Sequence, residues 1–99
     1  MSFAVLAEPT RRELLDLLRD GERSVRELVD RLDMSQPAVS KHLRVLREAG
    51  LVEVRPDAQR RLYRLRLEPF AEIDEWLAPY RELWARSLDR LEQHLEEDP

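Results

Sequence analysis

Apolar residues change their spacing twice along this 99-residue chain. As far as residue 50 they recur every three or four positions, which is the spacing of helices buried along one side. Between residues 51 and 67 they alternate with polar residues, as in strands with one buried face. From residue 69 the helical spacing returns. The pattern therefore predicts a mainly α-helical fold with a small β-hairpin between two helical regions.

Two short helices are predicted on either side of a tight turn at Asp33–Met34. The first begins at Ser24, which has a glutamate three residues later and so matches a capping box. The second begins at Ser35, whose hydroxyl can accept a hydrogen bond from the first helical turn. It ends at Gly50, because glycine readily adopts the left-handed conformation that follows a helix. Two helices joined in this way form a helix-turn-helix, which we predict over about residues 24–50.

The second of these helices is expected to have one apolar and one basic side. Val39, Leu43 and Leu46 form the apolar side, and Glu48 is the only acid on the other side. Because a helix-turn-helix places its second helix in the DNA major groove, we interpret the polar side as a DNA-binding face. The predicted DNA contacts are Gln36, Ser40 and Lys41 at base edges, Ser35, His42 and Arg44 at phosphates, and Pro37 beside them.

Two stretches of alternating apolar and polar residues within about residues 51–67 predict a two-stranded wing. They flank a polar tip at residues 56–61, which lacks glycine and leaves the turn type open. Arg60 and Arg61 lie at this tip, where a wing reaches the adjacent minor groove or the DNA backbone. We predict that both contact DNA, in preference to a charged, solvated loop.

The N-terminal run and the C-terminal third contain more apolar surface than a domain of this size can cover. Helices are predicted over about residues 69–97, with a kink or break near Ala78 because Pro79 removes a helical hydrogen bond. We predict that this surface forms a homodimer interface. Its expected members are Phe3, Val5, Leu6, Trp76, Tyr80, Trp84, Leu88 and Leu91.

The formal net charge of −4 is unevenly distributed. Residues 35–66 carry eight basic and three acidic side chains, whereas residues 67–99 carry three basic and ten acidic ones. Charges more than about 10 Å apart are largely screened at ordinary salt, so the local surplus decides contact with phosphate.

No stretch has the length of a membrane span. We expect one domain, residues 1–99, in the cytoplasm.

The stretch from residue 24 to residue 52, centred on SQPAVSKHLRVLREAGLV, resembles the winged helix-turn-helix of the ArsR/SmtB family of bacterial transcriptional repressors. The resemblance extends to residues 6–11 and to the predicted hairpin, while the C-terminal third matches in character only. It implies a sequence-specific, homodimeric repressor that binds an inverted-repeat operator in double-stranded DNA. The alternatives are a winged helix that binds a basic protein partner through the acidic tail, and a MarR-like regulator that responds to a small ligand. No inducer is identified by the sequence.

Catalytic chemistry is not expected from this chain. His42 and His94 fall on different predicted elements and match no known order of catalytic residues. With only Gly21 and Gly50, the sequence has no glycine-rich loop for phosphate. Cysteine is absent, which excludes disulfides and thiolate metal sites. We therefore predict neither enzymatic activity nor a cofactor.

The resemblance implies metal sensing, because many members of the family respond to metals. For this chain we do not expect it. The family's Cys-x-Cys pair corresponds to Ser24 and Arg26 in this sequence. A second family site takes Asp, His and Glu ligands from the C-terminal helix, where the spacing here does not fit. The only residues available for it are His94, Asp89, Glu97 and Asp98. We predict no metal site.

Overall fold

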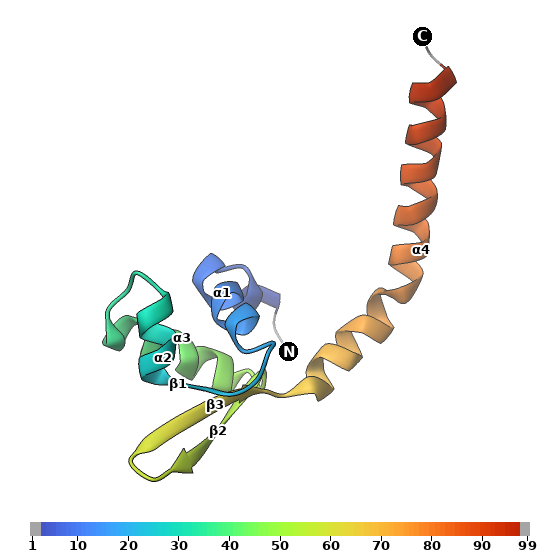
Figure 1. The fold of residues 1–99 in the computed structure, drawn as a ribbon. Coiled ribbons are helices and arrows are strands. Elements are labelled where there is room, and N and C mark those ends of the chain that lie inside the picture. The colour runs from blue at the N-terminus through green and yellow to red at the C-terminus, as the bar shows by residue number, and fades with distance from the viewer. Residues whose placement is uncertain (1–2, 98–99) are drawn as a thin grey trace. The chain divides into compact units, whose positions relative to one another are not determined.

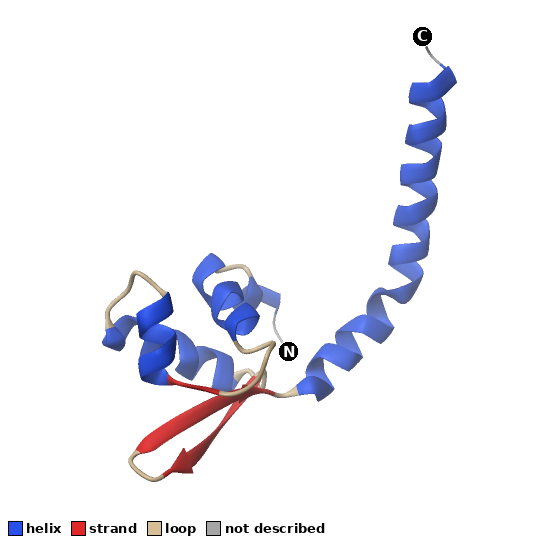
Figure 2. Cartoon of the chain, in the orientation of Figure 1, coloured by secondary structure: helices blue, strands red, loops and turns tan. Residues whose placement is uncertain are grey.

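A computed structural model of the protein describes residues 3–97. It divides into two compact units, Met1–Pro69 and Phe70–Pro99. Figures 1 and 2 show the succession of helices and strands, which matches the predicted mainly α-helical fold with a β-hairpin. The elements are the 3-10 helix η1 (Phe3–Leu6), α1 (Pro9–Leu17), β1 (Arg23–Ser24), α2 (Val25–Arg31), α3 (Gln36–Glu48), β2 (Val52–Asp57), β3 (Arg60–Leu65) and α4 (Leu67–Glu97).

The predicted helix-turn-helix is confirmed as α2 and α3, and the predicted serines are the N-cap residues of the two helices. The Glu27 N–H donates to Ser24 Oγ at 3.2 Å, and the Ser24 N–H donates to Glu27 Oε1 at 3.2 Å, which completes the capping box. At the start of α3 the Ala38 N–H donates to Ser35 Oγ at 3.3 Å. Gly50 follows α3 with a φ of +79°, in the left-handed region that favours glycine. These caps fix both ends of α3.

The core of the first unit lies between α1, α2, α3 and the sheet. α3 contacts α1, α2 and β2, and its predicted apolar side faces these elements. Because its apolar side is held against these elements, α3 has one orientation about its own axis. Its opposite side therefore faces away from the core. The largest fully buried side chains are Leu14, Leu28, Leu43, Leu46, Leu51, Val39 and Val52.

The sheet has three antiparallel strands in the order β1-β3-β2. β2 and β3 confirm the predicted two-stranded wing, and β1 is a third strand that was not predicted. β1 pairs Arg23 with Tyr63, and its two residues are too few to show an alternating pattern. The hairpin of β2 and β3 lies within the predicted wing and closes through Ala58 and Gln59. Ala58 has a φ of +56°, which is uncommon for a residue with a Cβ atom.

Two arginines at the start of α1 hold η1 in place. Arg11 Nε donates to the carbonyl of Val5 at 2.7 Å, and Arg12 Nη1 donates to the carbonyl of Leu6 at 2.8 Å. These carbonyls end a helix too short to satisfy them internally. Val5 and Leu6 are half-buried, while Phe3 is exposed. The apolar N-terminal run is therefore anchored to α1 within its own unit.

The predicted C-terminal helices are a single helix, α4, so a break at Pro79 does not occur. Pro79 has no N–H to donate within the helix, and Figure 1 shows α4 changing direction in its orange section. Arg81 bridges the turns on either side, because its Nη2 donates to the carbonyl of Asp74 at 3.3 Å and its Nη1 pairs with the Asp74 carboxylate. No helix among residues 3–97 has the length and apolar character needed to cross a membrane.

Candidate nucleic-acid interface

The outer side of α3 is a continuous polar and basic surface, as predicted from the spacing. Its stripe of Val39, Leu43 and Leu46 is fully buried against the rest of the first unit. Since these residues face inward, the opposite side of the helix faces outward. Those exposed on this surface, together with the helix-capping Ser35, are Gln36, Pro37, Ser40, Lys41, Arg44 and Arg47, with the acid Glu48 at the end of the helix.

His42 differs from the other predicted contacts because it lies at the edge of this surface. The residue is half-buried, and its Nδ1 is shielded from solvent with no hydrogen-bond partner in the described part of the chain. An imidazole held in this way turns part of its ring toward the protein. His42 is thus placed less favourably for phosphate contact than Lys41 or Arg44, which are exposed.

The two arginines at the tip of the hairpin have different surroundings. As adjacent residues of β3, Arg60 and Arg61 point to opposite faces of the sheet. Arg60 Nη2 lies 2.6 Å from Asp57 Oδ2, so an acid offsets its charge. Arg61 has no hydrogen bond or ion pair with any residue between 3 and 97. Of the two, Arg61 offers the unpaired guanidinium.

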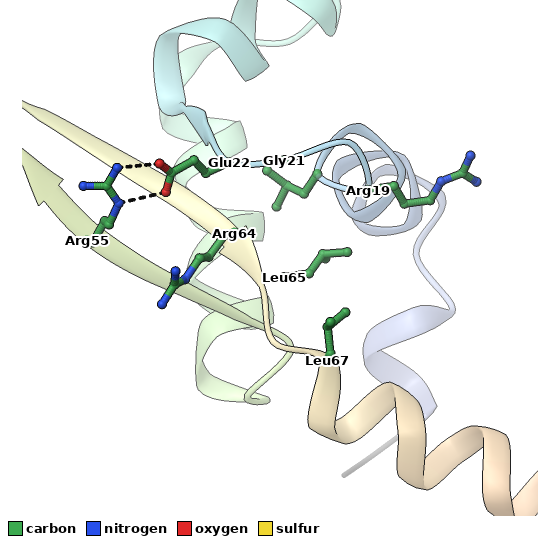
Figure 3. Close-up of a pocket in the computed structure, with 8 residues that line it drawn as sticks. Arg19, Gly21, Glu22, Arg55, Arg64, Leu65 and Leu67 are labelled. Carbon is green, nitrogen blue, oxygen red and sulfur yellow. Dashed lines mark hydrogen bonds and ion pairs between the residues drawn. The ribbon is translucent and has the colours of Figure 1, made fainter.

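Further along the hairpin, ion pairs occupy two more arginines. Arg55 donates two hydrogen bonds to the Glu22 carboxylate, the one from Nε at 2.9 Å, as Figure 3 shows. This hydrogen bonding is the main reason that the pKa of Glu22 is lowered and the pKa of Arg55 is raised. Arg64 Nε lies 2.6 Å from Glu53 Oε1. The positive charge of residues 35–66 is therefore not equally available to a ligand.

Four lysine and arginine side chains of α3 and the hairpin have neither a hydrogen bond nor an ion pair with another described residue. One of the four, Arg47, was not among the predicted DNA contacts. Its position three residues after Arg44 places both on one side of α3, and that spacing is the signal in the sequence. The full set is Lys41, Arg44, Arg47 and Arg61.

Two hollows border α3, and a third has no lining residue from this helix. A hollow of about 640 Å³ is lined by the start of α2, Gln36 of α3 and the hairpin tip. One of about 320 Å³ is lined by Arg47, Val54, Pro56 and Arg61. Figure 3 shows the third, of about 490 Å³, whose lining includes the Glu22–Arg55 pair and the apolar side chains of Leu65 and Leu67. The described residues include no group of three or more acids or histidines arranged to hold a metal ion.

Comparison with known proteins gives matches over most of the chain. Residues 8–54 match the family model described as "Bacterial regulatory protein, arsR family". The chain is 46% identical over 72 residues to the biofilm growth-associated repressor of Agrobacterium fabrum, covering 73% of this chain and 62% of that protein. It is 40% identical over 89 residues to the arsenic resistance transcriptional regulator ArsR1 of Pseudomonas putida, covering 78% and 70%.

A solved structure gives the same picture for the fold. The crystal structure of a possible transcriptional regulator for arsenical resistance superimposes with a TM-score of 0.71 at 43% identity, covering 93% of each chain. The chain spans about three fifths of the length of the Agrobacterium repressor. The winged helix-turn-helix described above is therefore shared with these proteins.

Proposed function

Because the chain belongs to the ArsR family of bacterial regulatory proteins, we propose that it is a DNA-binding transcriptional regulator without catalytic activity. The observation that carries this proposal is the exposed basic side of α3, fixed by its buried stripe and adjacent to a hairpin with an unpaired arginine at its tip. We further propose repression, by occlusion of promoter DNA, and a cytoplasmic location, because the regulator must reach the chromosome.

In the proposed complex α3 lies in the major groove and the hairpin contacts the flanking backbone or minor groove. Gln36, Ser40 and Lys41 contact base edges, because amide, hydroxyl and ammonium groups complement the donors and acceptors of that groove. We expect Arg60 and His42 to contribute less than the other phosphate contacts, because Asp57 pairs with the first and the second is half-buried. The remaining phosphate contacts are Ser35, Arg44 and Arg61.

Lys41→Ala is expected to weaken binding to specific DNA by about fivefold to 150-fold, since a base contact contributes about 1–3 kcal/mol. The measurement is fluorescence anisotropy with a duplex selected from a random pool by the wild-type protein. Arg19→Ala is the matched control, because Arg19 is also an exposed basic residue but lies outside α3 and the hairpin. Equal affinity of Lys41→Ala and wild type would mean that α3 does not read bases.

We also propose that the regulator is a homodimer, with α4 and the N-terminal run supplying the interface. The stripe on α4 is exposed within its own unit, and Phe3 is 53% exposed. A two-fold dimer presents two recognition helices, so the operator is expected to be an inverted repeat with half-sites about 34 Å apart. Sequences selected from the random pool should show this symmetry.

Operator binding is expected to be insensitive to metals. A sensory site of this kind needs about four ligands, most of them thiolate or imidazole, and this chain has no cysteine and two histidines. The test adds zinc, nickel, copper or arsenite to the preformed protein–DNA complex and follows release of the duplex. Release at low micromolar free metal, together with a stoichiometric site by calorimetry, would contradict this proposal.

A further inference from the structure

The hollow of about 320 Å³ lies between the last turns of α3 and the hairpin. Arg47 borders it from α3, and Arg61 borders it from β3. Val54 and Pro56 of β2 complete the lining. The hollow thus has two cationic side chains, two apolar ones and no acid.

Both arginines are unusual for this part of the molecule, because the structure of residues 3–97 gives them no hydrogen bond or ion pair. Their neighbours Arg55, Arg60 and Arg64 are each engaged by an aspartate or glutamate. An unpaired guanidinium keeps all its donors for a ligand, and its planar fork matches the oxygens of a phosphate. Arg47 and Arg61 are therefore the basic side chains of this hollow that an anion can bind without displacing an acid.

The hairpin register explains how Arg61 is positioned. Arg61 is paired with Pro56, so both side chains lie on the same face of the sheet as Val54. The apolar stem of the arginine can pack along these residues while its charged end stays in water. Pro56 has no N–H, and it is tolerated because β2 is an edge strand. The hairpin thus presents Arg61 toward the side where Arg47 lies.

We propose that Arg47 and Arg61 together bind one stretch of DNA phosphodiester backbone that passes between α3 and the hairpin. This inference rests on the proposed function, since it requires α3 to lie in the major groove. The backbone is the ligand, because guanidinium groups bind phosphate in bidentate fashion and the hollow has no acceptor side chain to pair with base donors. The contact fixes register and affinity without reading sequence.

The first test is the salt dependence of binding to a selected duplex by wild type, Arg47→Ala, Arg61→Ala and the double variant. In a homodimer on an inverted repeat each single substitution removes one contact per half-site, so it should make the slope of log K against log salt shallower by about 1.8, and the double by about 3.6. Arg19→Ala, at an exposed arginine outside α3 and the hairpin, is the matched control and should leave the slope unchanged. Arg47→Lys with Arg61→Lys keeps both charges and should retain most of the slope, which separates lost contact from misfolding. An unchanged slope in the double alanine variant, or an equal change in Arg19→Ala, overturns the inference.

The second test locates the phosphates. Neutral methylphosphonates replace single phosphates of the same duplex, one position at a time. At the contacted positions wild type should lose affinity, while the double alanine variant, which has already lost the contacts, should not. Equal losses for both proteins at every position overturn the inference. If wild type binds no selected duplex, the proposed function fails; if it binds with a steep slope that these arginines do not affect, only the present inference fails.

Discussion

Leu88→Glu is expected to convert a dimeric protein into a monomer. Seven large apolar side chains of the Phe70–Pro99 unit are each at least half exposed, a surface that monomeric soluble proteins rarely leave open. A glutamate placed in such a contact would be buried without a partner, at a cost of several kcal/mol. Trp84→Glu should act in the same way. The seven are Trp76, Tyr80, Leu83, Trp84, Leu88, Leu91 and Leu95.

Sedimentation velocity at micromolar concentration measures the effect directly. Operator affinity should fall when the dimer is lost, because the two half-sites are then no longer bound by one molecule. Gln93→Glu is the matched control. It makes the same change in charge on the same helix, but Gln93 is two residues from both Leu91 and Leu95, which places it on the other side of α4. A wild-type protein that is already monomeric, or a dimeric Leu88→Glu variant, would rule out the α4 interface.

The helix-turn-helix could be predicted from the sequence because its signals are local. Ser24 and Glu27 form the capping box within four residues, and Ser35 and Gly50 mark the two ends of α3 by their own chemistry. The outward face of α3 then follows from the helical period. The predicted surface residues of α3 are accordingly exposed, apart from the half-buried His42.

The pairing of the arginines could not be predicted in the same way. Glu22 and Arg55 are 33 residues apart in sequence, and only the fold brings them together. The two-residue strand β1 could not be predicted for the same reason. Its sequence shows no strand pattern, and it forms because the path of the chain brings it beside β3. Composition counts eight basic residues between 35 and 66, but the contacts decide which of them are available to phosphate.

The course of α4 agrees with the kink, and not with the break, of the two alternatives predicted near Ala78. Pro79 removes one hydrogen bond, and that loss predicts a kink or break. Asp74 and Arg81, seven residues apart, interact across the proline and link the flanking turns. The helix changes direction instead of ending.

Leu43→Ala is expected to lower the free energy of unfolding by about 2–5 kcal/mol, because it removes a fully buried side chain from the centre of the first unit and leaves a cavity. Domains of this size are stable by only about 5–15 kcal/mol, so the change is a large fraction of the total. Urea denaturation, at one fixed protein concentration because a dimer's stability depends on concentration, should show a lower midpoint with an unchanged slope.

Lys41→Ala is the control for this prediction, because Lys41 lies two residues away on the exposed side of the same helix. It should change the unfolding free energy by no more than about 0.5 kcal/mol, as is usual at the surface, while weakening operator binding. Leu43→Ala should show the reverse at temperatures where it remains folded, since its DNA-facing side chains are intact. If both variants lost stability and affinity together, α3 would not have one side for the core and another for DNA.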